Sequence, residues 1–391
     1  MQRHGKAIAT RHRPTGMNTR FAGAGLPFAE YVQRTQAMLR RVHAGNGDLD
    51  KIVAGNSPFE LRPAGDFRKG RDKPYERGVL LTHGLTDSPY FMRHLAAFFQ
   101  RNGFRVMVVL LPGHGTRPGD TLEVRWQEWA KTVAYGADCL AAEADELYLA
   151  GFSAGAALNI LHSLDDARVR GLLLFSPALE LPVRAKYAHW HRWYSWLIPS
   201  AQWAHIRPDA DIYKYESLSK NSVAQVYALS KALGARLRNR DLDIPVFAAA
   251  SADDVTVHTS ATLRFMARTR HPGSRLVLYT TAPDDPPPGI PAERLELVNS
   301  VVPQQRIISS AHTAIVLPPD DPHYGAAGEY VNCQHYYEDD LEKYGACKNG
   351  EVLQGEITET NLKTGILRRL MYNPNHAALE ISMKRFIDSL P

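Results

Sequence analysis

Short apolar runs that do not alternate with polar residues are the strongest constraint on the fold of this chain. Between them lie segments whose apolar residues recur every three or four positions, as they do in amphipathic helices. Runs that are apolar throughout predict strands buried on both faces, which occur in mainly parallel sheets covered by helices. We therefore expect an α/β fold. The expected strands are 77–84, 105–115, 146–153, 169–179, 244–254 and 274–280, and the expected helices are 88–104, 124–144, 154–164, 260–270 and 375–390.

Three stretches interrupt this alternation and set the expected organisation of the 391 residues. Residues 182–243 hold four of the six tryptophans, residues 281–302 are proline-rich and predict a loop, and residues 317–363 are polar and rich in tyrosine. A chain of this length can form one large domain with insertions. We expect a basic, disordered tail over 1–29, a helix (30–43) and an early strand within 30–75, and the main domain over 76–391, with insertions at about 182–243 and 317–363.

The positive charge of the chain is confined to its first residues. The formal net charge is +5, and residues 1–29 carry five basic residues and no acid, so the remaining 41 basic and 41 acidic residues cancel. A neutral body does not predict nucleic-acid binding. The Arg-rich start is either a disordered tail or a targeting segment, and it lacks the apolar stretch of a secretory signal. No run is long and apolar enough to predict a transmembrane helix. A cytoplasmic location is expected.

Three cysteines are too few for a disulfide framework. Cys139 falls in a helical pattern and is expected in the core. Cys333 and Cys347 lie in one polar region and could pair, and the sequence leaves this open. No Cys/His spacing matches a zinc site, so no metal is expected.

The stretch Gly151-Phe-Ser-Ala-Gly155 places Ser153 where an expected strand ends and an expected helix begins. The pattern G-x-S-x-G in that context predicts a sharp turn that exposes a nucleophilic serine. Backbone N–H groups at the start of a helix also favour negative charge, which suits an oxyanion. Ser153 is therefore the candidate nucleophile.

A serine needs a base to act as a nucleophile, and the expected chain order is Ser, then acid, then His. Asp253 and Asp254 come just after residues 244–251 of the expected strand, and Asp254 is the preferred acid, with Asp253 left as the alternative. His312 follows a short apolar segment in a loop before the final helix and is the candidate base. Two backbone N–H groups would stabilise the oxyanion, one from Ala154 and one from Leu85 in the loop after the first main strand.

These motifs together resemble a known family. "LLTHGLTDSP", "LLPGHGTRPGD", "GFSAG", "SADDVTV" and "SSAHT" occur in order over about 80–315. The chain resembles the α/β-hydrolase superfamily and, within it, the monoacylglycerol lipase and carboxylesterase group of serine aminopeptidase-type hydrolases. The resemblance implies ester hydrolysis through an acyl-enzyme with no cofactor, a structural role for His114, and a cap over the active site at 182–243. It does not extend to the tyrosine-rich insertion or the first 75 residues.

The expected function is therefore cleavage of a small-molecule carboxylic ester. Trp190 and Trp193 in the cap are candidates to line the substrate pocket, with packing onto the core as the alternative. Two other functions stay open: a peptidase of the iminopeptidase type, which needs an acidic group for the substrate amine, and a non-catalytic binding protein on the same fold. The sequence does not indicate acyl length, alcohol group or oligomeric state.

Overall fold

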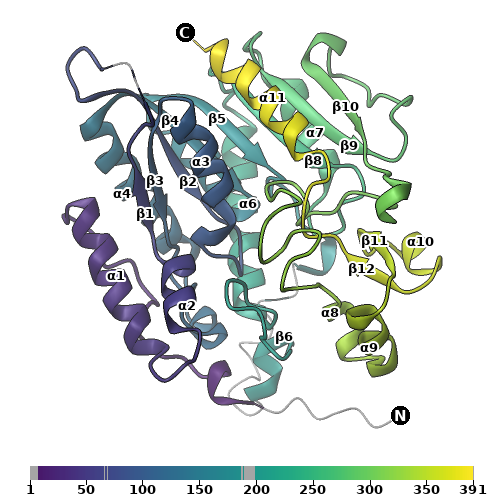
Figure 1. Ribbon diagram of the computed structural model, residues 1–391. Coiled ribbons are helices and arrows are strands. Elements are labelled where there is room, and N and C mark those ends of the chain that lie inside the picture. Colours follow the sequence, from purple (N-terminus) through teal and green to yellow (C-terminus); the bar gives the residue numbers. More distant parts are fainter. Residues whose placement is uncertain (1–7, 66, 68, 186–187, 189–198, 391) are drawn as a thin grey trace. The chain divides into compact units, whose positions relative to one another are not determined.

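The computed structural model describes residues 8–65, 67, 69–185, 188 and 199–390 (Figure 1). These residues form two compact units. Unit 1 takes its described residues from 174–182 and 241–390, and unit 2 takes its own from 8–173 and 183–240.

The sheet of unit 2 is mainly parallel, as the apolar runs predict. β2 pairs in parallel with β3 on one side and β4 on the other, β1 joins the outer edge of β3 in the antiparallel sense, and β5 follows β4. Every residue of β3 is buried, as expected for a strand covered on both faces. The strands are β1 (Phe59–Leu61), β2 (Tyr75–Thr82), β3 (Arg105–Val109), β4 (Ala144–Phe152) and β5 (Val169–Phe175), and the last two residues of β5 are counted in unit 1.

Helices cover this sheet where the sequence predicts them. α4 contacts β2, β3 and β4, while α5 packs beside α4 on β4, and α6 from the first insertion packs on α5. Cys139 in α4 is half-buried and has a free thiol. The helices are α3 (Arg93–Arg101), α4 (Trp126–Glu143), α5 (Ala154–Ser163) and α6 (Lys220–Leu237). Two short strands, β6 (Trp203–His205) and β7 (Leu218–Ser219), precede α6 and pair with each other.

The N-terminal helices belong to unit 2. α1 (Phe28–Val42) includes the helix expected over 30–43, and α2 (Leu49–Asn56) follows it. α1 buries residues at helical spacing along one side, and its Tyr31 hydroxyl donates to the carbonyl of Leu110 at 3.1 Å. The segment is therefore fastened to the end of β3.

The expectation of a disordered tail over 1–29 is wrong for residues 8–29, while residues 1–7 lie outside the described residues. Residues Thr10–His12 form a short 3-10 helix, and the His12 side chain is buried against the ring of Trp203. Arg11 pairs with Asp209 at 3.3 Å. The arginine-rich composition indicated solvated charge, but acidic partners far along the chain neutralise part of it.

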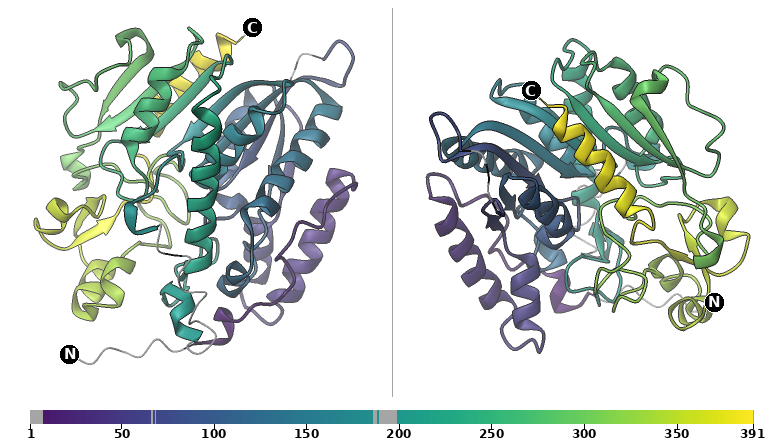
Figure 2. Two further views of the ribbon diagram at one scale, coloured as in Figure 1. Left: turned by 180° about the vertical axis from the view of Figure 1, so that it is seen from behind. Right: turned by 45° about the horizontal axis from the view of Figure 1, so that its top comes forward.

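Unit 1 holds three parallel strands in the order β8, β9, β10. Figure 2 shows α11 lying across them, and the rings of Phe247 in β8 and Phe386 in α11 are 5.6 Å apart. The elements are β8 (Val246–Ser251), α7 (Thr259–Arg268), β9 (Arg275–Thr280), β10 (Leu295–Asn299) and α11 (His376–Asp388).

β10 corrects the expectation that 281–302 is only a loop. Its residues are half-buried or exposed, because it is the outermost strand of this sheet. β10 is short and follows a proline-rich stretch, and both features weaken the sequence pattern by which a strand is predicted.

The tyrosine-rich insertion is a small folded layer of unit 1 stapled by a disulfide between Cys333 and Cys347. Both cysteines are fully buried in a cluster with Tyr336, which settles the pairing that the sequence left open. β11 and β12 pair in parallel. The elements are α8 (Gln334–Tyr337), α9 (Leu341–Asn349), β11 (Leu353–Gly355), α10 (Glu359–Leu362) and β12 (Leu367–Arg369).

Across the described ranges, none of the helices is both long enough and apolar enough to cross a bilayer.

Removal of the disulfide tests how much it stabilises this layer. We expect the double variant Cys333→Ala/Cys347→Ala to lose roughly 2–4 kcal/mol of stability, the usual range for a bridge that closes a loop of this size. Urea unfolding followed by far-UV circular dichroism measures the loss, and Cys139→Ala is the control for loss of a thiol. An unchanged midpoint in the double variant would contradict this account.

Candidate active site

Ser153 lies at the turn between β4 and α5, where the sequence predicts it. Its backbone has φ 53° and ψ −115°, which is unusual for a residue with a side chain. The residue is 7% exposed. Such strain persists only where the surrounding structure enforces it, and it concentrates at functional sites.

The turn is enforced by close packing of α5 against the end of β2. A methyl group at Gly155 would overlap the carbonyl oxygen of Thr82 and would lie 2.5 Å from the carbonyl oxygen of His83. A methyl group at Gly84 would lie 3.1 Å from the Cβ of Ser153. These glycines bring the loop that follows β2 directly against the serine.

Two buried histidines shape that loop, which spans residues 82–89. Nε2 of His83 accepts a hydrogen bond from the backbone N–H of Leu111 at 3.1 Å, so its Nδ1 carries the proton and donates to the carbonyl of Gly84 at 2.9 Å. Nε2 of His114 accepts from the backbone N–H of Thr86 at 3.1 Å. Burial lowers the pKa of His83 well below its usual range and lowers the pKa of His114 to about 4. Both rings are therefore neutral at physiological pH and serve as fixed hydrogen-bond partners, which agrees with the structural role implied for His114.

Thr86 occupies a left-handed conformation, with φ 67°, and is held from a second side. Its carbonyl accepts from the backbone N–H of Tyr215 at 2.9 Å, and its hydroxyl accepts from Lys214 Nζ at 2.9 Å. Lys214 also forms a short ion pair with Asp87, which is buried. Lys214 and Asp87 could not be predicted as a pair, because their contact depends on the approach of the first insertion to this loop.

The candidate oxyanion donors are the backbone N–H groups of Leu85, just before Thr86, and of Ala154, just after Ser153. Ala154 is the first residue of α5, where the backbone N–H has no partner within the helix. Within the described part of the chain, neither the Leu85 nor the Ala154 N–H makes a backbone hydrogen bond. Leu85 and Ala154 therefore stay the predicted oxyanion donors.

Asp254 and His312, both in unit 1, form a hydrogen-bonded pair. Nδ1 of His312 lies 2.6 Å from Oδ2 of Asp254, and the two side chains are 6% and 1% exposed. The second oxygen, Oδ1, accepts from the backbone N–H groups of Thr256 and Val257 at 2.7 and 3.0 Å. The carboxylate therefore fixes the ring so that Nδ1 carries a proton and Nε2 can accept one.

Asp253 does not share this arrangement. Its Oδ2 is buried without a hydrogen-bond partner in the described structure, and burial together with the nearby charge of Glu356 raises the pKa of this carboxyl to about 6. The geometry favours Asp254 over Asp253 as the acid beside His312.

A buried ion pair contacts the backbone of the same histidine. The backbone N–H of His312 donates to Oε2 of Glu356 at 2.9 Å, and Glu356 pairs with Arg369 at 2.8 Å. Both residues come from the second insertion and the segment that follows it. Nothing in the sequence distinguished Glu356 from the other acids of that polar stretch.

Trp190 and Trp193 lie outside the described residues. The candidate residues in unit 2 are Ser153, Leu85 and Ala154, and those in unit 1 are Asp254 and His312. Within the ranges that the structure describes, no group of His, Cys, Asp and Glu side chains could hold a metal ion.

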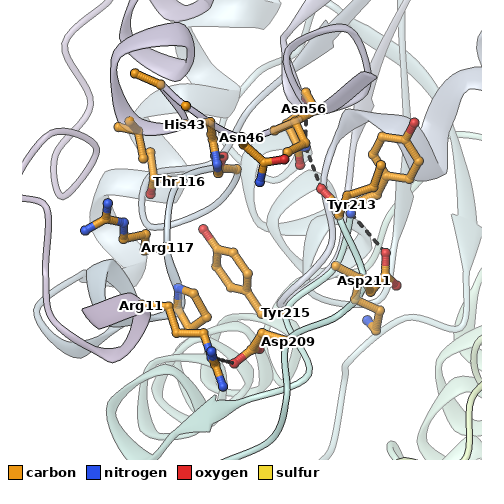
Figure 3. A pocket seen from close by; sticks show the side chains of 18 residues that line it. Arg11, His43, Asn46, Asn56, Thr116, Arg117, Asp209, Asp211, Tyr213 and Tyr215 are labelled. Atoms are coloured by element: carbon orange, nitrogen blue, oxygen red, sulfur yellow. Dashed lines mark hydrogen bonds and ion pairs between the residues drawn. The ribbon is translucent and has the colours of Figure 1, made fainter. Parts of the chain in front are cut away.

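Unit 2 also contains a cavity of about 380 Å³, drawn in Figure 3. The described residues that line it include Lys214 and Tyr215 but not Ser153 or Leu85. Arg11 and Asp209 face each other at one side as an ion pair. One wall of the cavity is therefore the segment that holds Thr86.

The parallel strands, the strained serine at the start of α5 and the adjoining loop define an α/β hydrolase. Residues 73–282, more than half of the chain, match the family described as "Serine aminopeptidase, S33". The chain belongs to that family.

Known relatives include lipases. A thermostable monoacylglycerol lipase of Bacillus sp. (strain H-257) is 30% identical over 108 residues, which are 28% of this chain and 43% of that lipase. The chain thus matches less than half the length of this relative. A structure reported for the metagenome-derived lipolytic enzymes LipS and LipT is 19% identical in sequence and has a TM-score of 0.46. The alignment covers 57% of this chain and 87% of the chain in that structure. The structure of the monoacylglycerol lipase of Paleococcus ferrophilus is 17% identical in sequence and has a TM-score of 0.42. That alignment covers 53% of this chain and 86% of the lipase chain.

Substitution of Gly155 tests the packing that enforces the serine turn. We expect Gly155→Ala to destabilise the protein by about 3 kcal/mol or more, because backbone atoms of β2 leave no room for the methyl group. Gly234→Ala is the matched control: Gly234 lies in α6 with nothing within 4 Å of the added carbon. That change should stabilise the helix by roughly 0.5–1 kcal/mol. Equal effects of the two substitutions in urea unfolding would refute this packing argument.

Asp253 predicts a pH-dependent loss of stability. Its folded pKa of about 6 lies above the ordinary aspartate value of 3.8, so the folded state binds more protons between these values and stability falls as pH rises through them. The side chain is partly solvated, so we expect Asp253→Asn to gain about 1 kcal/mol at pH 8 and nothing at pH 3.5. Urea midpoints at the two pH values measure the difference, with the exposed Asp243→Asn as the control for loss of one charge. A gain that is the same at both pH values would contradict the shift.

Proposed function

We propose that this chain hydrolyses carboxylic esters through an acyl-enzyme on Ser153. The observation that carries the proposal is the strained Ser153 turn. Among the described residues, the N–H groups of Leu85 and Ala154 near it make no backbone hydrogen bond. The Asp254–His312 pair supplies the base that such a serine requires.

In the proposed reaction, Oγ of Ser153 attacks the ester carbonyl while Nε2 of His312 takes the serine proton. The carbonyl oxygen becomes an oxyanion, which the N–H groups of Leu85 and Ala154 stabilise. The C–O bond to the alcohol then breaks, and the imidazolium returns its proton to the leaving alkoxide. Water attacks the acyl-enzyme with His312 again as base, which releases the acid and restores Ser153. Asp254 stabilises the imidazolium in both steps.

The proposed substrate is a small or medium acyl ester, with a monoacylglycerol as the leading case. The name of the Bacillus relative supports this class. The reaction uses protein groups alone and requires no cofactor. Trp190 and Trp193 stay predicted pocket residues in the cap.

The predicted cytoplasmic location is weakened by the disulfide between Cys333 and Cys347. Reducing compartments keep thiols free, and stable disulfides are typical of oxidising ones. We therefore propose no compartment.

A peptidase is the second candidate, favoured by the description of the matched family. It would use the same serine chemistry on an amide and would need an acidic group to hold the substrate amine. A non-catalytic role would leave the strain at Ser153 and the buried Asp254–His312 pair without a use.

Kinetics on p-nitrophenyl acetate, butyrate, octanoate and palmitate, and on a monoacylglycerol, test the proposal. We expect Ser153→Ala and His312→Gln to lower kcat/KM by roughly 10⁴–10⁶-fold. Asp254→Asn should lower it by roughly 10²–10⁴-fold, because the ring would lose its fixed tautomer. The matched variant Asp253→Asn should stay within about threefold, since Asp253 does not contact the ring.

Three outcomes would contradict the proposal. Full activity in Ser153→Ala would identify another nucleophile, and equal losses in the two aspartate variants would remove Asp254 from its role. Turnover of aminoacyl p-nitroanilides by folded protein that is inert on every ester would establish the peptidase instead.

A further inference from the structure

The loop that carries His312 is held by a buried ionic contact from a segment that the catalytic motifs do not include. We call residues 353–373 the clamp segment: it comprises β11, α10, β12 and the four residues after β12. Its Glu356 is fully buried, and its Arg369 is largely buried, with a side chain 16% exposed. Buried charges are costly unless they are paired and hydrogen-bonded, so their position calls for a reason.

The carboxylate of Glu356 is fully used. Oε2 accepts from the backbone N–H of His312 and from Arg369 Nη2, both at 2.9 Å. Oε1 accepts from the backbone N–H of Ile357 at 2.9 Å and lies 2.8 Å from Arg369 Nε. The guanidinium therefore lies against both oxygens, with a hydrogen bond from Nη2 to Oε2 and an ion-pair contact between Nε and Oε1 that is not aligned for a hydrogen bond. One of those oxygens at the same time fixes the backbone of the catalytic histidine.

Arg369 extends this contact to the loop of the catalytic acid. Its Nη2 donates to the hydroxyl of Thr256 at 2.7 Å. Thr256 in turn donates its backbone N–H to Oδ1 of Asp254 at 2.7 Å. One ion pair thus touches both the backbone of His312 and the loop that orients Asp254.

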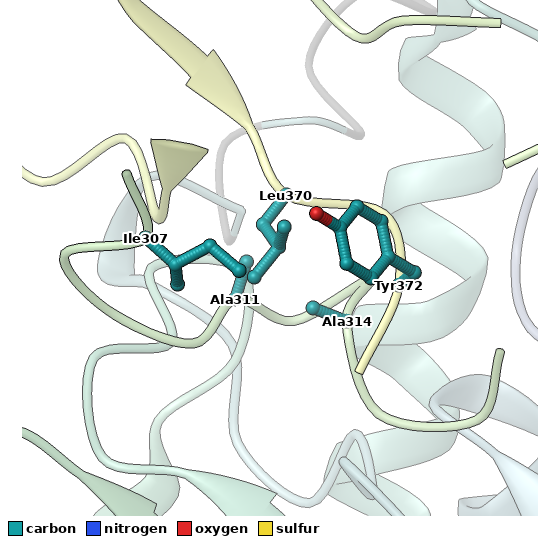
Figure 4. Close-up of a cluster of buried hydrophobic side chains, with 5 residues drawn as sticks. All are labelled: Ile307, Ala311, Ala314, Leu370 and Tyr372. Carbon is teal, nitrogen blue, oxygen red and sulfur yellow. The ribbon is translucent and has the colours of Figure 1, made fainter. Parts of the chain in front are cut away.

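Apolar packing fixes the same two pieces of chain against each other. We call residues 307–314, which carry His312, the histidine loop. In Figure 4, Leu370 and Tyr372 of the clamp segment lie beside Ile307, Ala311 and Ala314 of this loop. These five side chains form one buried cluster.

Hydrogen bonds on either side of the cluster add to this packing. The hydroxyl of Thr313 donates to the carbonyl of Leu370 at 2.7 Å. The backbone N–H of Glu356 donates to Oγ of Ser309 at 2.9 Å. The histidine loop is therefore bound to the clamp segment on both sides of His312.

We propose that Glu356 and Arg369 are positioning residues for the His312–Asp254 pair, and that the second insertion and the segment after it serve the reaction by supplying them. The inference rests on the proposed function, because it assumes that His312 is the base. Neither residue touches the reacting atoms in this assignment. They hold the imidazole of His312 and the carboxylate of Asp254 in a fixed relative orientation. Their loss therefore lowers the rate of the chemical steps and leaves substrate binding unchanged.

The test compares Glu356→Gln, Arg369→Gln and the double variant in kinetics on p-nitrophenyl butyrate. Glu356→Gln keeps the shape of the side chain but leaves Arg369 without its counter-charge. We expect kcat to fall 10–100-fold with KM within threefold in each single variant, and a loss in the double variant well below the product of the single losses.

Two control variants separate positioning from general destabilisation. Glu351→Gln makes the same chemical change in an exposed ion pair with Arg306 and should leave kcat unchanged. Leu379→Ala removes a buried side chain of α11 in the same unit and should lower stability without lowering kcat at a temperature where it stays folded. A second readout is the downfield proton resonance of His312 Nδ1, which should shift or broaden in Glu356→Gln and stay in place in both controls.

Glu356→Gln with kcat within threefold of the native protein and an unmoved Nδ1 resonance overturns the inference. If this variant does not fold, Arg369→Lys is the deciding test of the inference. Lysine keeps the positive charge but cannot contact both carboxylate oxygens of Glu356 and the hydroxyl of Thr256 at once. We expect it to lower kcat 3–10-fold, and an unchanged kcat overturns the inference. Failure of the proposed function has a different signature: native protein that turns over no ester, or Ser153→Ala with native activity.

Discussion

The close approach of α5 to the end of β2 is the constraint on which the rest of this structure depends. Gly155 allows that approach, and the approach forces Ser153 into a backbone conformation that residues with side chains rarely adopt. The serine therefore stands at the start of a helix, beside the loop after β2. The partial positive charge at the start of a helix favours an anion, which is why we propose this place for the oxyanion.

Buried polar groups in each unit then fix the side chains to which the proposed reaction assigns a role. In unit 2, the loop beside the serine is held by His83 and His114, which burial keeps neutral, so that their hydrogen bonds do not change near neutral pH. In unit 1, the ring of His312 is held by Asp254, and its backbone is held by Glu356. In both units the costly step of burying a polar group is offset by specific partners, which is the arrangement that gives a single orientation.

Features that depend on local pattern could be predicted from the sequence. The non-alternating apolar runs identified β2, β3, β4, β8 and β9, because burial on both faces leaves a direct mark on composition. The serine turn was recognisable because its glycines are required by a contact close in sequence. The sequence also singled out Asp254 and His312, because each follows an apolar segment at the expected place in chain order, and the structure brings the two side chains into hydrogen-bond contact. Their catalytic roles stay predictions.

Features that depend on contacts between distant segments could not be predicted. Glu356 meets His312 across 44 positions, and the Arg11–Asp209 pair, which helps to order the basic N-terminal segment, joins residues much further apart. The same residue types on a surface would give the same sequence, so composition alone indicated solvated charge. β10 was missed because an edge strand carries a weak apolar signal.

The most direct test of the central claim is to find the residue that a fluorophosphonate modifies. The protein would be treated with the reagent, digested and mapped by tandem mass spectrometry, with His312→Gln as the second sample. This account predicts stoichiometric phosphonylation of Ser153 in the native protein and strongly slowed labelling in the variant, because the serine needs its base. Labelling at a different residue, or no labelling of protein that still turns over esters, would contradict it.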